Sequence, residues 1–160
     1  MAQAILGRPV AEDALILGIS GRYEFKNKGI DVFIDAMGQL NRNNGLGKEV
    51  LAFILVPAGH AGANKELLHN LELPYQAVTS TDLYLTHYLN DSANDPVMNR
   101  IRAQKLRNSE EDKVKIFFVP SYLNGDDGVL NMPYYDLLVG MDLTAFPSYY
   151  EPWGYTPLES

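Results

Sequence analysis

Three short apolar blocks constrain the fold of this chain more than any other feature. They read ALILGIS at 14–20, VLAFILV at 50–56 and KVKIFFVP at 113–120, and a glycine or a proline closes each of them. Runs of this length and composition are typical of strands that are buried on both faces of a parallel sheet. A fourth strand is expected in DLTAFPS at 142–148.

Helical patterns lie between these blocks. Apolar residues spaced by three and four from Ile30 to Leu40 predict an amphipathic helix. Asp95 is a typical N-cap, and Pro96 suits the first helical position, so a second helix is predicted to start there. Helices are expected over 30–40, 64–71, 96–107 and 134–141, and a loop over 59–65. Alternating strands and helices build right-handed crossover units, so the predicted fold class is α/β, a Rossmann-like parallel sheet with flanking helices.

The composition limits the cellular setting and the partners. The chain has 160 residues, enough for one domain with one core. Its net charge of −7 disfavours nucleic acid and anionic membranes as partners. Cysteine is absent, which excludes a disulfide scaffold and a thiolate metal site. No segment approaches the ~20 apolar residues of a membrane span, so we expect a soluble, cytoplasmic protein.

The last segment, PSYYEPWGYTPLES at 147–160, ends where a helix is expected to begin. Thr156, Pro157 and Glu159 match a capping box: a threonine cap, a proline at the first helical position and a glutamate three residues after the cap. The predicted helix therefore starts at 157, close to the last residue of the chain. We expect residues 1–160 to be a partial domain of a longer protein.

Two polar segments follow predicted strands at the edge of the sheet where ligands bind. Ligands of open parallel sheets lie at the carboxyl ends of the strands, near helix N-termini that favour anions. GRYEFKNKG at 21–29 follows the first strand and contains Arg22 and Lys28, and the segment after the fourth strand contains Glu151. Two cations and a carboxylate at this edge suggest a site for a phosphate and for hydroxyl groups.

Each of these residues also has a purely structural interpretation. Arg22 and Lys28 could be solvated charges of a polar loop, and Glu151 could belong to a structural ion pair. The capping box alone explains Glu159. Tyr134 and Tyr135 open the helix before the fourth strand; one is expected in the core, and the other could offer a flat face on which a base stacks.

Several other kinds of site are excluded by the sequence. His60, His69 and His87 lack the spacing of zinc ligands, and GDDG at 125–128 is typical of a turn. The sequence contains neither a G-x-x-x-x-G-K-[ST] loop nor a G-x-S-x-G elbow. Because GRYEFKNKG is no dinucleotide fingerprint either, a dehydrogenase is disfavoured.

Three segments resemble the C-terminal half of the glycogen synthases of animals and fungi. They are GRYEFKNKGIDVFIDAM, then DPVMNRIR with DKVKIFFVP, and FPSYYEPWGYTPLE, whereas 57–94 is dissimilar apart from THY at 86–88. The resemblance implies a retaining glycosyltransferase of the GT-B type, in which two Rossmann-like domains face each other. Such an enzyme transfers glucose from UDP-glucose to the non-reducing end of an α-1,4-glucan and needs no metal or other cofactor.

The resemblance also implies residue roles. Glu151 would contact the donor glucose near the reacting carbon, with Arg22 and Lys28 on the diphosphate. Tyr134 would stack on uracil. The remaining positions expected to bind the nucleotide sugar are Gly21, Trp153, Gly154, Tyr155, Thr156 and Glu159, the last near the ribose.

The resemblance covers the donor-binding half only. The glucan acceptor would bind to an N-terminal domain outside these residues, so this chain alone is not expected to turn over. The connection between the second and third strands is shorter than in the animal and fungal enzymes. Two alternatives stay open: a nucleotide-sugar-binding module without catalysis, and a related GT-B transferase with another donor. A bare strand edge of a truncated sheet would favour a homo-oligomer.

Overall fold

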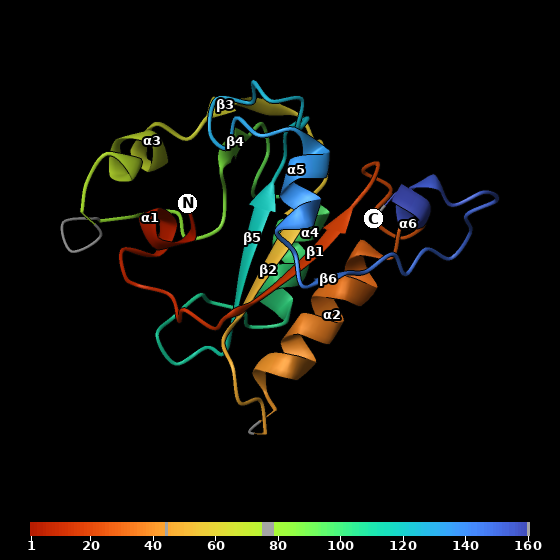
Figure 1. Cartoon of the computed structure of the whole chain (residues 1–160), viewed down its shortest axis with the longest axis horizontal. Coiled ribbons are helices and arrows are strands. Elements are labelled where there is room, and N and C mark those ends of the chain that lie inside the picture. The colour runs from red at the N-terminus through yellow and green to blue at the C-terminus, as the bar shows by residue number, and fades with distance from the viewer. Residues whose placement is uncertain (44, 75–78, 160) are drawn as a thin grey trace.

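The fold is built on a four-stranded parallel sheet with the strand order β5-β2-β1-β6 (Figure 1). This computed structural model describes residues 1–43, 45–74 and 79–159, and only the backbone at 156 and 159. The strands are β1 (Leu15–Ser20), β2 (Val50–Leu55), β5 (Val114–Val119) and β6 (Leu143–Thr144). The three apolar blocks are therefore strands, and the predicted α/β fold is confirmed.

The fourth strand was predicted too long, because it spans two residues instead of 142–148. The Ala145 N–H still donates to the Gly18 carbonyl at 2.8 Å, but Pro147 has no N–H to continue the ladder. The chain leaves the sheet there, and Ser148 donates to the Phe146 carbonyl in a turn. This early exit directs the following residues towards the loop after β1.

Helices cover both faces of the sheet. On one face, α2 (Ile30–Asn41) and α4 (Pro96–Ala103) pack against side chains of β1, β2 and β5 in the main core. On the other, α1 (Ala2–Leu6) and α3 (Lys65–Leu71) pack in a smaller core with Leu51 and Phe117. Because adjacent residues of a strand point to opposite faces, uniformly apolar strands require both layers.

The other element boundaries differ in part from the prediction. The helix expected over 96–107 ends at Ala103, because Lys105 adopts a left-handed conformation with φ 58°. The predicted loop at 59–65 contains β3 (His60–Ala63), which pairs antiparallel with β4 (His87–Leu89). Helix α5 spans Tyr134–Val139, close to the prediction. The short helix α1 was not expected from the sequence.

The last helix, α6 (Tyr155–Glu159), begins two residues before the predicted start at 157. Gly154, just before it, has a left-handed φ of 68°. Thr156 therefore lies within the helix by its backbone, one residue after the first helical position. The side chains of Thr156 and Glu159, and with them the predicted capping box, lie outside the described residues.

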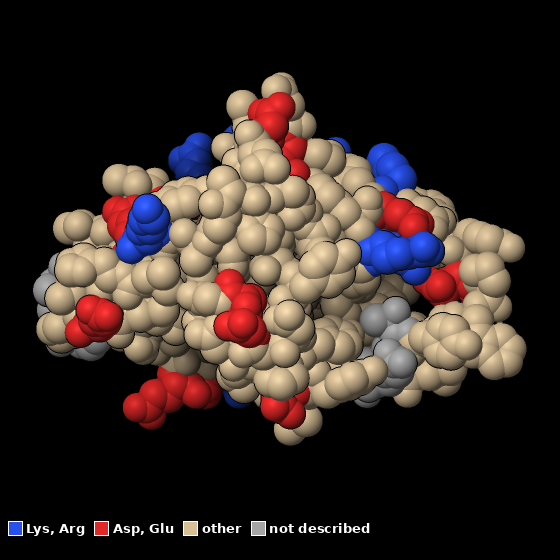
Figure 2. Space-filling model, turned by 90° about the horizontal axis from the view of Figure 1, so that it is seen from above, with Lys and Arg blue, Asp and Glu red and all other residues tan. Residues whose placement is uncertain are grey.

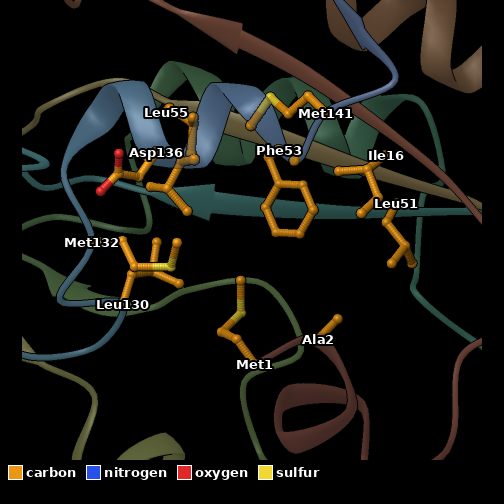
Figure 3. Close-up of a pocket in the computed structure, with 12 residues that line it drawn as sticks. Met1, Ala2, Ile16, Leu51, Phe53, Leu55, Leu130, Met132, Asp136 and Met141 are labelled. Carbon is orange, nitrogen blue, oxygen red and sulfur yellow. The ribbon is translucent and has the colours of Figure 1, made fainter.

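A cavity of about 300 Å³ remains on the sheet face that α5 covers (Figure 3). Met1, Met132, Met141 and Phe53 line it among other apolar side chains. The cavity shows that this face of the sheet is incompletely covered, and the surface left bare there is nearly all apolar. Among the described residues, no helix has the length and apolar character required to cross a membrane.

Candidate functional site

The loop after β1 and the segment after β6 lie side by side at the carboxyl end of the sheet (Figure 1). The Tyr149 N–H donates to the Asn27 carbonyl at 2.8 Å and joins them. Gly29 permits this approach: its φ is +65°, and a Cβ there would lie 2.1 Å from the Pro147 carbonyl oxygen. Two segments that are far apart in the sequence thus share one site.

A cavity of about 580 Å³ opens between these segments. It is lined from the carboxyl ends of all four strands, as expected for a ligand site of a parallel sheet. Its lining residues are Gly21, Arg22, Tyr23, Lys28, Pro57, Tyr122, Glu151 and Tyr155. The structure therefore brings together the two cations and the carboxylate that the sequence singled out.

Lys28 and Glu151 form an ion pair in this cavity through Nζ and Oε2. The Lys28 side chain is only 10% exposed and that of Glu151 is 29% exposed. The hydrogen bond from Lys28, together with the positive charges of Lys28 and Arg22, lowers the pKa of Glu151 below its ordinary value. The structural ion pair considered for Glu151 exists, and it lies within the candidate site.

Arg22 stands at the rim of the same cavity. Its side chain is 78% exposed, and Nη2 lies 3.1 Å from a carboxylate oxygen of Glu24. Such an exposed pair holds the guanidinium weakly, so Arg22 is free to turn towards a ligand. Both interpretations of Arg22, as a solvated charge and as a cation that binds a ligand, are therefore compatible with the structure.

A second cavity, of about 260 Å³, adjoins the first. The two share Gly21, Pro57 and Tyr122 as lining residues. Tyr134 lines the second cavity from α5, with its hydroxyl 2.6 Å from Ser20 Oγ. Its ring lies edge to face with that of Tyr135, with centroids 5.4 Å apart. A two-part ligand could therefore extend from Lys28 towards Tyr134.

The glycogen synthase family model matches residues 10–81 and 75–160 of this chain. The chain belongs to the glycogen synthase family. Glycogen [starch] synthase isoform 2 of Saccharomyces cerevisiae is 33% identical over 92% of this chain and 30% of its own length. The glycogen [starch] synthase of Neurospora crassa is 31% identical over 92% of this chain and 29% of its own length. The liver glycogen [starch] synthase of Rattus norvegicus is 30% identical over 92% of this chain and 28% of its own length. The chain thus spans about 30% of the length of these relatives.

The comparisons also bear on the connection predicted to be short. The alignment with the yeast relative extends over 208 residues, more than the 160 of this chain, so the relative carries residues without a counterpart here. The family model matches in two parts that meet at 75–81, between β2 and β5. Both findings agree with a shortened connection at this point.

Other residues expected to bind the nucleotide sugar lie at or beside the cavity. Tyr155 lines it, and its ring centroid is 6.2 Å from that of Trp153, which is 71% exposed. A Cβ at Gly154 would lie 3.6 Å from Glu151 Cγ, so this glycine is next to the ion pair. The predicted roles of Thr156 and Glu159 concern side chains outside the described residues.

Three lining residues were not singled out from the sequence: Tyr23, Pro57 and Tyr122. Pro57 lies two residues after the end of β2 and Tyr122 three after the end of β5, so their position near a strand end was the available signal. Tyr23 is fixed from elsewhere, because its hydroxyl donates to Asp95 Oδ2 at 2.5 Å. Burial and the Asp95 carboxylate raise the pKa of Tyr23 well above its ordinary value.

Among the described residues, no histidine lines either of the two cavities. The rings of His60 and His87 are 4.7 Å apart, and buried His87 bonds to the Asp127 carbonyl at 2.8 Å through Nε2. Within the part of the chain that the structure describes, no three His, Cys, Asp or Glu side chains gather as a metal site requires.

Proposed function

We propose that this chain forms the nucleotide-sugar-binding part of a retaining glucosyltransferase. The complete enzyme would transfer glucose from UDP-glucose to the non-reducing end of an α-1,4-glucan. The observation that carries the proposal is that Arg22, Lys28 and Glu151, from segments far apart in the sequence, line one cavity at the carboxyl ends of the strands. Membership of the glycogen synthase family supports the same activity.

The residues of the cavity match the charges of the proposed reaction. Cleavage of the bond between glucose and phosphate develops negative charge on the leaving diphosphate and positive charge on the sugar. Fixed cations near the diphosphate stabilise that transition state, which is the proposed role of Arg22 and Lys28. Glu151 would lie beside the glucose, and the adjoining cavity of Tyr134 would take the uracil ring.

The proposed partners follow from the same argument. The donor is a nucleotide sugar, and the glucan acceptor would be held by a part of the enzyme beyond these residues, so this chain alone is expected to be inactive. Since two side chains offset the diphosphate charge, the proposal includes neither a metal nor another cofactor. The proposal places the protein in the cytoplasm, without nucleic acid or membrane partners. On the face seen in Figure 2, basic side chains are isolated or lie beside acidic ones, so this face carries no basic patch for such a partner.

Calorimetry with this chain tests the donor site. We expect UDP and UDP-glucose to bind, and ADP-glucose to bind more weakly. Lys28→Ala should weaken UDP binding about 10- to 100-fold, the range for a hydrogen bond to a charged group. Lys48→Ala is the control: Lys48 forms an exposed pair with Asp13 at 3.6 Å, and its loss should leave binding unchanged. Absence of UDP and UDP-glucose binding, or equal binding by Lys28→Ala, would contradict the proposal.

The catalytic part of the proposal needs the complete enzyme. There, Glu151→Gln should lower glucan elongation by roughly 10²–10³, as removal of one preorganised charged partner of a transition state typically does. Full activity of this variant would remove Glu151 from the proposed mechanism and leave a binding role only.

A further inference from the structure

Glu151 holds the place beside Lys28 that an anionic ligand would take. The carboxylate contacts the Lys28 ammonium, and both line the larger cavity. Next to the pair, the Tyr149 N–H donates to the Asn27 carbonyl, so the backbones of the two segments lie side by side here. The ion pair therefore joins two segments whose backbones are also held together at this point.

Both cations of the cavity lie beside a carboxylate, Arg22 in a weak exposed pair and Lys28 in a close one. Arg22 lies 3.1 Å from Glu24, and Lys28 is bound to Glu151. Figure 2 shows basic and acidic side chains next to each other on the right of the molecule, which is the side where α6 lies in Figure 1. A diphosphate that binds Lys28 competes with Glu151 for the ammonium and brings phosphate oxygens close to a carboxylate of the same sign.

We propose that the Lys28–Glu151 ion pair makes this cavity select a sugar-linked diphosphate over the free nucleoside diphosphate. The inference rests on the proposed function and adds a specificity-determining role for Glu151. A carboxylate that loses its cation needs new hydrogen-bond donors, since an unpaired, partly buried charge is costly. The hydroxyl groups of a linked glucose supply such donors. Free UDP supplies none there, so Glu151 competes with it for Lys28.

Calorimetric titration of this chain with UDP and with UDP-glucose tests the proposal. Glu151→Gln removes the charge, keeps the size and retains an amide that can bond to sugar hydroxyls. UDP should then bind about fivefold more tightly, the upper range for a partly exposed ion pair. UDP-glucose should gain less, so the preference for the sugar-linked ligand falls. Asp13→Asn removes the same charge from an exposed pair with Lys48 and should leave both affinities unchanged.

A second variant separates the contact from the net charge. Glu151→Asp keeps the charge but withdraws it by one methylene, so its UDP affinity should lie between wild type and Glu151→Gln. It also carries the test if thermal unfolding shows that Glu151→Gln is not folded.

The possible results are distinguishable. If the wild-type chain binds UDP and Glu151→Gln binds it equally or more weakly, the ion pair does not select UDP-glucose over UDP. This inference is then overturned, while the proposed function stands. If the wild-type chain binds neither UDP nor UDP-glucose, the proposed function fails and the inference fails with it.

Discussion

The hydroxyl of Tyr23 donates a hydrogen bond of 2.5 Å to the carboxylate of Asp95. Asp95 is also the N-cap of α4, where its Oδ1 accepts from the Met98 N–H at 3.0 Å. One buried carboxylate therefore holds a helix start and a cavity-lining residue at the same time. Through Tyr23, helix α4 fixes the loop that carries Arg22.

Tyr23→Phe should weaken UDP binding severalfold, because the loop bearing Arg22 loses its anchor. The free energy of unfolding should also fall by about 1–3 kcal/mol, since a hydrogen bond to a charged group is lost. Calorimetry and thermal denaturation measure the two effects.

Tyr84→Phe is the matched control for this variant. The Tyr84 hydroxyl donates to the Leu106 carbonyl at 3.1 Å, a contact of a similar half-buried tyrosine away from the cavity. Its loss should reduce stability but leave UDP affinity unchanged. Equal loss of affinity in both variants would show that stability, and not loop position, controls binding.

Gly29→Ala should separate the two halves of the site. The added Cβ would meet the Pro147 carbonyl, and alanine tolerates the φ of +65° poorly. We expect a loss of about 1–3 kcal/mol in stability and a marked loss of UDP-glucose binding, because the segment with Glu151 must move away from Lys28. Gly47→Ala is the control, since a Cβ at Gly47 has nothing within 4 Å, and it should behave as wild type.

The features predicted from the sequence are those encoded locally. VLAFILV at 50–56 indicates a buried strand by itself, and cations after a strand indicate a ligand edge. His60–Ala63 was missed because HAGA lacks the branched and aromatic residues of typical strands, and its pairing with His87–Leu89 is set by tertiary structure. The contacts of Lys28 with Glu151 and of Tyr23 with Asp95 likewise depend on how distant segments meet.

His60 should make stability depend on pH. Burial and the neighbouring His87 ring lower the pKa of His60 below its ordinary value of 6.5, and its Nδ1 accepts from the Gly62 N–H at 3.1 Å. The unfolded chain therefore takes up a proton on this residue at a higher pH than the folded chain does. Stability from this source is complete above about pH 6.5 and falls as the pH drops below it.

His60→Asn should remove that part of the pH dependence, because asparagine can still accept from the Gly62 N–H but does not titrate. Denaturant unfolding between about pH 5 and 8 measures it as the difference between variant and wild type. Parallel curves for the two proteins would assign the acid sensitivity to other groups.

The position of β6 at the end of the sheet should promote self-association. Leu143 of this edge strand is 58% exposed, and nearby Val139 is 88% exposed. An apolar groove of about 260 Å³ runs between α2 and β6. Exposed strand edges and apolar patches recruit further chains, so light scattering should show a mass that rises with concentration. Leu143→Lys should reduce this association, whereas Leu71→Lys, at a site 41% exposed on α3, should not. A strictly monomeric wild type at high concentration would contradict the prediction. It would indicate that the two-residue strand β6 is too short to pair with another chain.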